Sequence, residues 1–455
     1  MSISNSRSTP HILPWAVLTL AILEAAQFTY FRNQLGDYIS PIVLYFTAVA
    51  LCLVTAWSVR HKPLPTLLPV AVRGGSWWPG ALALTVGLAL CLPLLKSRIE
   101  GTLAQDYSDI IPALTVYCQR FLNGEVVHRP LTEDLGYFLE PGYLPATWFP
   151  FVVSEYFRFD YRWMSTFIML LGIVSYLITV VRLRRGPLLT FGLGMLPFVF
   201  TYYVLRPTDD AVLRANADIF SLTVEPLIIG YYLLLVAGVL LPSRPLFIIA
   251  LVLCLLSRYS LVFWVPLYVG LVYVNESRQW AWTIVGLAAA GVLAFYVVPV
   301  LSHDWGLFMR VQKVYTETTL GEWRNSGEDG RPYHLYNGIG LTNLFYHFGS
   351  GDLLTRLKLA KAVHLLSVVA IVIGAALVYW RQRLPRINYR LYAVIVLKLY
   401  LTTFYALLQV PYTYLAIVGF FISLYLVVIA VGPAVMESAE ATPLQSAFVK
   451  DAEVS

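Results

Sequence analysis

The sequence contains few charged residues. Asp, Glu, Lys and Arg make up 13% of its 455 residues, whereas 58% are hydrophobic and 15% are aromatic, and the mean hydropathy is +0.68. Charged residues form roughly a quarter of an ordinary soluble domain, so this composition excludes a soluble globular chain. The net charge of +6 comes from Lys and Arg clustered in short loops. We attribute it to orientation in a membrane and expect no nucleic-acid partner.

Cysteines are also scarce, and no spacing relates them. The four cysteines are Cys52, Cys91, Cys118 and Cys254. Three of them lie in apolar segments, which excludes a disulfide framework and a cysteine metal site. The first apolar segment, starting near Ile12, lacks a basic leader and a small-residue cleavage site. We therefore expect no cleavable signal peptide.

Long apolar runs dominate what is present. Runs of about 20 residues, enough to cross about 30 Å of hydrocarbon, recur along the chain and are continuous rather than alternating, which excludes a strand barrel. The sequence predicts an all-α polytopic membrane protein with about 12 transmembrane helices. The expected spans are 12–31, 38–58, 78–95, 163–181, 187–205, 218–241, 245–257, 259–274, 280–301, 361–380, 391–408 and 412–432. The short span 245–257 is followed by Arg258, so this pair is expected to be a broken or tilted hairpin.

Basic loops predict the orientation. Their residues are Arg60, Lys62 and Arg73, then Arg182, Arg184 and Arg185, then Arg381, Arg383, Arg386 and Arg390. All three loops fall on one side, with both termini in the cytoplasm, if 143–158 lies in the membrane interface as a helix instead of crossing. The chain then divides into an N-terminal hairpin with a cytoplasmic loop (1–77), a transmembrane core (78–432) and a flexible cytoplasmic tail (433–455). Two long outer loops, 96–162 and 302–360, suggest function because loops of this length are uncommon.

The first outer loop carries two acidic residues beside the membrane, Asp106 and Asp109, separated by Tyr107 and Ser108. Apolar residues at helical spacing follow and predict a short interface helix over 110–123, ended by Gly124. Asp109 or Ser108 can act as its N-cap, but Asp106 has no such capping role.

A carboxylate here suits sugar transfer from a lipid phosphate. The phosphate leaves readily, whereas the acceptor hydroxyl must lose its proton as it attacks, and a carboxylate can accept that proton. Asp106 is the first candidate for the catalytic base and Asp109 the second. Together they could instead hold a divalent cation, but two acids are a weak metal signal, so we expect no metal and no cofactor.

Candidate phosphate ligands are the arginines of the outer side. Arg258 lies between two apolar runs, where a charge is costly and usually functional, and a guanidinium can bind phosphate in a bidentate fork. Alternatively, Arg258 snorkels or forms an ion pair with Glu225. Arg206 and Arg214 lie in another outer loop and could assist a pyrophosphate, or simply be solvated.

Aromatic and polar residues mix in both long outer loops. Tyr107 in the first, and His334, Tyr336 and Asn337 in the second, suit contacts with a sugar, an acceptor or a lipid headgroup, and equally suit an ordered surface loop. His334 and His347 show no carboxylate partner pattern, so we reject a zinc site. Three charged residues within spans stand singly, and we interpret each as making a hydrogen bond between helices rather than an ion pathway: Glu24, Glu225 and Lys398.

These features resemble the GT-C superfamily of polyprenyl-phosphate-sugar-dependent glycosyltransferases. The resemblance covers about 78–380 and depends on an acid at the start of the first large outer loop, an interface helix after it, and the Pro/aromatic stretch 143–150. Protein mannosyltransferases and lipid A aminoarabinose transferases are similar in this arrangement. Two features differ: an additional hairpin (12–31 and 38–58) precedes the matching region, and the acids are spaced Asp-x-x-Asp instead of adjacent.

The resemblance implies inverting transfer of a hexosyl-type sugar outside the cytoplasm. The donor would be a polyprenyl-phosphate sugar, the acceptor a hydroxyl of a glycan, lipid or protein, and the base the first-loop aspartate. We expect a multi-pass protein among membrane lipids of the bacterial inner membrane, acting in glycan or glycolipid biosynthesis of the cell envelope. The alternatives are a surface-polysaccharide polymerase or ligase, and a transporter or flippase of a lipid-linked sugar. A transporter is less favoured, because no second broken helix matches the one near Arg258.

Overall fold

The computed structural model describes residues 12–60, 77–100, 110–135, 140–182, 186–206, 224–241, 243–325, 327, 330–381 and 387–431. These residues fold into helices and include no strand. Eight of the helices are long and apolar enough to cross a membrane. They are α1 (Ile12–Thr29), α2 (Ile39–Val59), α3 (Trp78–Glu100), α8 (Tyr161–Arg182), α9 (Pro187–Leu205), α14 (Arg278–Val292) continued by the π-helical η3 (Leu293–Val297), α17 (Leu353–Arg381), and the 3-10 turn η6 (Thr413–Ala416) continued by α19 (Ile417–Val431).

The remaining four expected spans are also helical but shorter or more polar. They correspond to α11 (Val224–Leu240), α12 (Arg244–Leu255), α13 (Trp264–Asn275) and α18 (Tyr389–Ala406). The prediction of an all-helical polytopic membrane protein is therefore confirmed, with eight helices meeting the length and hydropathy needed for a span. The break expected beside Arg258 is present, because α12 ends at Leu255 and a 3-10 turn, η2 (Tyr259–Leu261), precedes α13.

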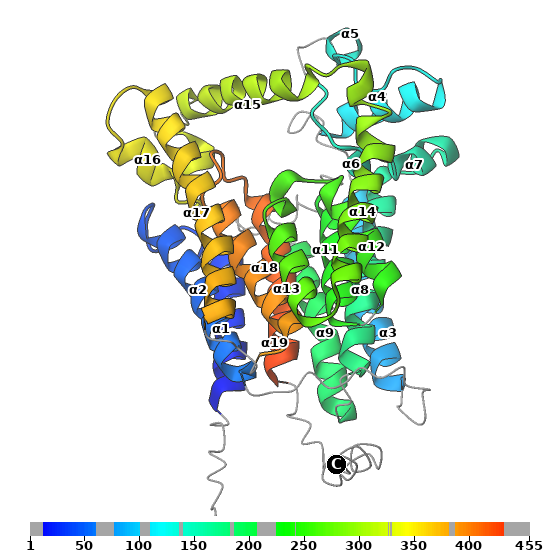
Figure 1. The fold of residues 1–455 in the computed structure, drawn as a ribbon, viewed down its shortest axis with the longest axis vertical. Helices are drawn as coiled ribbons and strands as arrows, with labels where there is room; N and C mark the ends of the chain where they lie inside the picture. The colour runs from blue at the N-terminus through cyan, green and yellow to red at the C-terminus, as the bar shows by residue number, and fades with distance from the viewer. Residues whose placement is uncertain are drawn as a thin grey trace, which may run out of the picture.

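Helices that lie outside the bundle gather at one of its ends, which we call the upper end (Figure 1). They are α4 (Ile110–Leu122), α5 (Thr132–Leu135), α6 (Pro145–Trp148), α7 (Phe151–Phe157), α15 (Leu307–Arg324) and α16 (Thr342–Phe348). The basic residues Arg60, Arg182 and Arg381 stand at the C-terminal ends of α2, α8 and α17, at the opposite, lower end.

The interface helix of the first loop forms as expected, but a second expectation was wrong. Helix α4 stops before Gly124, whose φ of 71° lets the amide of Glu125 reach the carbonyl of Arg120 at 2.8 Å. By contrast, 143–158 is not one helix but two short ones, α6 and α7. Pro150 has no amide hydrogen to donate to the preceding turn, so the helix is interrupted there.

The second long loop is more ordered than the sequence indicated. Helix α17 begins at Leu353, two turns before the expected 361, and 302–360 contains α15 and α16. In Figure 1, α15 crosses the upper end roughly perpendicular to the bundle, from the side of α14 to that of α16 and α17. The charged residues interrupting its apolar positions explain why no apolar run revealed it.

Helix α11 lies at the centre of the bundle, and all but one of its residues are buried. It packs most extensively on α8. A β-carbon on Gly172 of α8 would lie 2.8 Å from Cα of Gly230 of α11. Small residues at such crossings allow two backbones to approach closely, which is a common basis of helix association in membranes.

Candidate functional site

Several predicted site residues lie outside the described part of the chain. Asp106, Tyr107 and Asp109 belong to 101–109, and Arg214 belongs to 207–223. Their roles therefore stay predictions. The described helices flank the two segments. The end of α3 and the start of α4 flank the first, and the end of α9 and the start of α11 flank the second.

Arg162 holds the C-terminal end of α3 in place. It is the second residue of α8, is 3% exposed and pairs with Asp160 at 2.6 Å. Its guanidinium also donates to the carbonyl oxygens of Arg98, at 3.4 Å, and Ile99. These carbonyls belong to the last turn of α3, where no partner is available within the helix. The end of α3, which precedes the segment carrying Asp106 in the sequence, is thus held to α8.

A second buried arginine organises the rest of the first upper loop. Arg120 of α4 pairs with Asp134. It also donates to the carbonyl oxygens of Val127, Arg129 and Pro130 at 3.2, 2.7 and 3.0 Å. These bonds account for its charge, so Arg120 is a structural residue.

His128 lies in the same loop between the rings of Tyr117 and Trp148. Its Nε2 lies 3.1 Å from the carbonyl oxygen of Tyr143. Burial lowers the pKa of His128 from 6.5 to about 4, although the bond to Tyr143 opposes this shift. The ring is therefore neutral at pH 7 and contributes packing rather than charge.

Arg258 forms an ion pair with Glu225, the second residue of α11. The arginine side chain is 15% exposed and the glutamate side chain 2%. Nη1 of Arg258 also lies 3.5 Å from the hydroxyl of Tyr405, which donates to Ser260 at 3.2 Å. The ion-pair interpretation is confirmed, whereas phosphate binding by Arg258 stays a prediction.

The second oxygen of this carboxylate differs from the first. Oε2 of Glu225 is buried and has no hydrogen-bond partner among the described residues. It can accept a hydrogen bond from a hydroxyl group, and an unmade bond at a buried acceptor is costly. The pair therefore offers a hydrogen-bond acceptor beside a neutralised guanidinium.

Helix α15 lies over this pair. The ring of Phe308 is 5.9 Å from that of Tyr259, the residue after Arg258, and the hydroxyl of Tyr259 lies 3.5 Å from that of Tyr296 in the π-helical turn η3. Such π-helical turns often occur at functional sites. Both ends of α15 are attached: Arg310 pairs with Glu140 of the first upper loop at 3.5 Å, and Trp323 donates to the carbonyl oxygen of Gln409 at 2.9 Å.

A chain of rings connects the Arg258 pair to His334. Tyr414 interacts electrostatically with both Arg258 and Glu225, which indicates that it lies in their neighbourhood. It stacks on Tyr412, with centroids 5.4 Å apart and planes at 13°, and the Tyr412 ring lies 4.7 Å from that of His334. The structure thus brings His334 and Arg258, predicted separately, into one region.

His334 also has a partner that sequence reasoning missed. Its Nε2 lies 3.7 Å from Oε2 of Glu322 in α15. The two residues lie on different elements with no helical spacing between them, so no sequence pattern indicates this contact. Burial lowers the pKa of His334 below its usual value, and Glu322 opposes this. No group of three or more potential metal ligands occurs in the described ranges.

Tyr336 and Asn337 hold the second upper loop in place. The amide of Asn337 donates to the carbonyl oxygen of Pro411 at 2.6 Å, and its own carbonyl accepts from the amide of Ile339 at 3.1 Å. Tyr336 is 9% exposed and packs on Tyr38, with centroids 6.2 Å apart. These contacts are structural, and a role at a sugar stays a prediction.

Arg206, the residue after α9, stacks on two tyrosines. Its guanidinium lies 5.2 Å from the ring of Tyr203 and 5.7 Å from that of Tyr30, at the end of α1. Stacking on aromatic faces leaves the N–H edges of a guanidinium available. A role at an anion is compatible with this position.

Lys361 of α17 is a candidate that sequence reasoning missed. Its ammonium donates to the hydroxyl of Thr316 in α15 at 2.7 Å and lies 5.8 Å from the ring centroid of Tyr315. None of the described carboxylates lies within 4.0 Å of this ammonium. Lys361 was overlooked because 361 was expected only as the first residue of a span.

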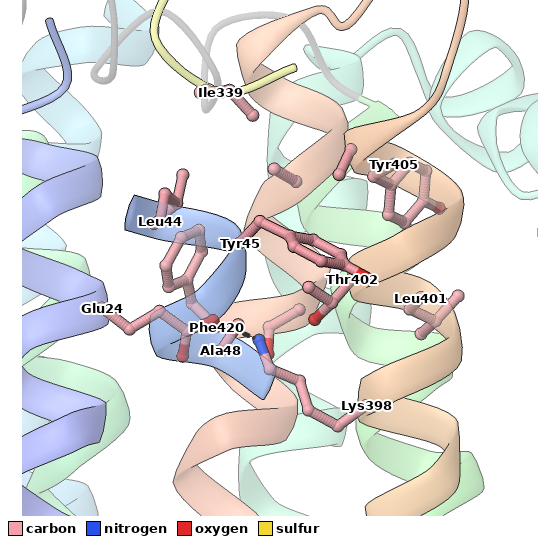
Figure 2. Close-up of a pocket in the computed structure, with 13 residues that line it drawn as sticks. Glu24, Leu44, Tyr45, Ala48, Ile339, Lys398, Leu401, Thr402, Tyr405 and Phe420 are labelled. Carbon is pink, nitrogen blue, oxygen red and sulfur yellow. Dashed lines mark hydrogen bonds and ion pairs between the residues drawn. The ribbon is translucent and has the colours of Figure 1, made fainter. Parts of the chain in front are cut away.

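Figure 2 shows a small cavity of about 40 Å³ between α1, α2, α18 and α19. Glu24 and Lys398 form an ion pair at its base, and Ser423 donates to the other oxygen of Glu24 at 2.7 Å. The interpretation of Glu24, Glu225 and Lys398 as residues that hydrogen-bond distant parts of the bundle is therefore confirmed, although they do not stand singly, because each belongs to an ion pair. A cavity of this volume has room for on the order of three water molecules and is too small for a sugar. Tyr405 lines it and also approaches Arg258.

Comparisons with protein-family models, curated proteins and solved structures found no match for this chain. Function is therefore inferred from the residues and their geometry.

Proposed function

We propose that this protein is a membrane-embedded, inverting glycosyltransferase of the GT-C type. It transfers a sugar from a polyprenyl-phosphate donor to the hydroxyl group of an acceptor. The observation that carries the proposal is the Arg258–Glu225 pair at the upper end of an apolar helix bundle, beneath the amphipathic helix α15. Charged residues at this depth are usually functional.

The transfer needs one base and a stabilised leaving group. The acceptor oxygen bonds to the anomeric carbon, the bond from that carbon to the phosphate oxygen breaks, and polyprenyl phosphate leaves with the electron pair. The acceptor proton passes to a carboxylate, for which Asp106 is the first candidate and Asp109 the second. A single displacement of this kind inverts the anomeric centre and needs no second catalytic carboxylate as nucleophile.

The surrounding residues suit substrate binding. Oε2 of Glu225 can accept a hydrogen bond from a sugar hydroxyl, while Tyr405 and Glu225 fix the guanidinium of Arg258 beside it. The His334–Glu322 pair, at the other end of the row of rings, offers further hydrogen-bonding groups to the acceptor. Aromatic rings such as those of Tyr412 and Tyr414 present apolar faces that suit sugar rings.

The proposed location is the bacterial inner membrane, with the upper end outside the cytoplasm. Basic residues at the lower ends of α2, α8 and α17 support this orientation, since cytoplasmic loops carry an excess of Lys and Arg. Polyprenyl-phosphate sugars would then reach the site from the outer leaflet, and the acceptor from the aqueous side.

A transporter of a lipid-linked sugar is the second candidate. The Glu24–Lys398 pair beside a cavity inside the bundle favours it, because charged pairs within membranes often serve ion-coupled transport. A transporter moves its substrate unchanged, whereas a transferase releases polyprenyl phosphate. Product analysis therefore separates the two candidates.

The test uses purified protein in nanodiscs with a panel of polyprenyl-phosphate sugars and acceptor glycans, lipids and peptides. We expect polyprenyl phosphate and a glycosylated acceptor to form together. Asp106→Asn should reduce this turnover by at least about a hundredfold, whereas the matched control Glu125→Gln, in the same loop and paired with Arg129, should leave it unchanged. Normal turnover by Asp106→Asn together with loss in Asp109→Asn would move the base to Asp109.

Chelation addresses the metal alternative in the same assay. We expect turnover to continue in a chelator, because a carboxylate base needs no metal. Loss of turnover that a divalent cation restores would instead assign Asp106 and Asp109 to metal binding. Absence of polyprenyl phosphate release with every donor and acceptor would reject the transferase.

A further inference from the structure

The ammonium of Lys361 is half-buried between α15 and α17, and none of the carboxylates that the structure describes neutralises it. Its contacts are with the hydroxyl of Thr316, at 2.7 Å, and the ring of Tyr315, at 5.8 Å. In the described ranges no carboxylate approaches it within 4.0 Å. A charge that is partly removed from water and unpaired is costly, so this position favours an anionic ligand.

The other charged residues described near Lys361 do not neutralise its ammonium. Arg356 donates to the carbonyl oxygens of Tyr346 and Gly351 at 2.6 and 3.0 Å, and Lys358 is exposed one turn before Lys361. Nearby Asp352 accepts from the amide of Thr355 at 2.9 Å. Across the interface on α15, Glu317 is exposed and lies 4.0 Å from Lys313. Positive charge therefore exceeds negative charge around Lys361.

Arg258 is in the opposite situation, because Glu225 neutralises it. We propose that Lys361, and not Arg258, binds the phosphate of the lipid-linked sugar. This assignment rests on the proposed function for the identity of the lipid. Helix α15 approaches both cations: Tyr315 contacts Lys361, and Phe308 contacts Tyr259 beside Arg258. The two cations therefore have different tasks at the same helix. Arg258 orients hydroxyl groups through its glutamate, and Lys361 meets the anion.

The position of Lys361 suits a lipid phosphate rather than a soluble anion. It lies in the upper part of α17, a helix long enough to span a membrane. Only 11% of the apolar stretch of this helix is buried in the protein. Leu365, one turn below on the same face, is 51% exposed, and Leu366 beside it is 66% exposed. A phosphate at Lys361 would place a polyprenyl chain along these leucines.

The charge change during transfer fits a lysine. The donor is a phosphodiester with one negative charge, and the departing polyprenyl phosphate is a monoester that gains a second. A fixed ammonium next to the leaving oxygen is more stabilising after the bond breaks than before, which favours the transition state over the bound donor. Lys361 would therefore bind polyprenyl phosphate more tightly than a neutral polyprenol.

The test measures binding without transfer, using polyprenyl phosphate and native mass spectrometry of the protein in nanodiscs. We expect Lys361→Met to weaken binding by on the order of tenfold or more and Lys361→Arg to retain most of it. The matched control Lys358→Met, an exposed lysine of the same helix, should remain within about twofold of the unchanged protein. Equal affinity of Lys361→Met and the unchanged protein, or equal losses in both methionine variants, would overturn the assignment.

Two further results separate this inference from the proposed function. Displacement of polyprenyl phosphate by equimolar phosphatidylglycerol would show a general anionic-lipid site and overturn the donor assignment. Lys361-dependent binding without sugar transfer would support the site while rejecting the transferase. Sugar transfer that needs Asp106 but is unaffected by Lys361→Met would support the transferase and reject the phosphate site at Lys361.

Discussion

Arg258 and Glu225 show how a charge is kept inside this bundle. The carboxylate is almost fully buried, the guanidinium is 15% exposed, and Tyr405 supplies a further hydrogen-bond partner. Removing one member of such a pair leaves an uncompensated charge, which costs far more than the pair contributes when intact. The pair therefore couples the function of this site to its stability, and single substitutions affect both.

Paired substitutions separate the two effects. We expect Arg258→Met to destabilise the protein by about 3–5 kcal/mol, because Glu225 is left buried and unpaired. Arg258→Met combined with Glu225→Gln should regain most of that stability but not sugar transfer. Thermal unfolding in detergent, followed by tryptophan fluorescence, measures the first quantity, and polyprenyl phosphate release measures the second. If Arg258→Met melts at the same temperature as the unchanged protein, the ion pair contributes nothing to the fold.

The ion pair of Arg258 with Glu225 could be predicted from the sequence, whereas that of Glu24 with Lys398 could not. Glu225 was a foreseeable partner for Arg258, because both interrupt neighbouring apolar segments. Glu24 and Lys398 are 374 residues apart, and nothing in either helix alone indicates their contact. Such a pair follows from tertiary packing, which brings α1 against α19 and α2 against α18. The same reason hides the contact between Lys361 and α15.

At the scale of elements, apolar run length predicted helices at all the expected spans, but it did not predict every helix end. Helix α17 extends two turns above its apolar run because its first turns contact α15 and α16 instead of lipid. Helix α15 was missed because only a stripe of its residues is apolar, and Leu307, Thr319 and Trp323 are buried. Helices at an interface need such a stripe, not an apolar run.

The crossing of α8 and α11 is a test of helix packing. A β-carbon at Gly230 would collide with the backbone carbonyl of Ile168, which cannot rotate away. We expect Gly230→Ala to destabilise the protein by about 1–3 kcal/mol, as overpacking does. Gly270→Ala in α13 is the matched control, because a β-carbon there meets nothing within 4 Å. The melting temperature should fall for Gly230→Ala alone, and equal values for both variants would contradict the close crossing.

For the whole molecule, successive helices of the bundle alternate in direction, and the helices outside the bundle collect at the upper end (Figure 1). The basic ends of α2, α8 and α17 collect at the lower end. This separation follows from the order of apolar and basic segments along the chain, so the sequence was sufficient to predict it. The side of the membrane on which each end lies was predicted from charge alone, and it decides where Asp106 would act.

Cysteine accessibility in intact cells tests that orientation. All four native cysteines are buried, so background labelling should be low. Lys313→Cys places a thiol on the exposed surface of α15 at the upper end, and Gln279→Cys places one at the exposed start of α14 at the lower end. A membrane-impermeant maleimide should label Lys313→Cys in intact cells and Gln279→Cys only after permeabilisation. The reverse pattern would put the upper end in the cytoplasm, where an outer-leaflet donor could not reach Lys361 and the proposed extracytoplasmic transfer could not occur.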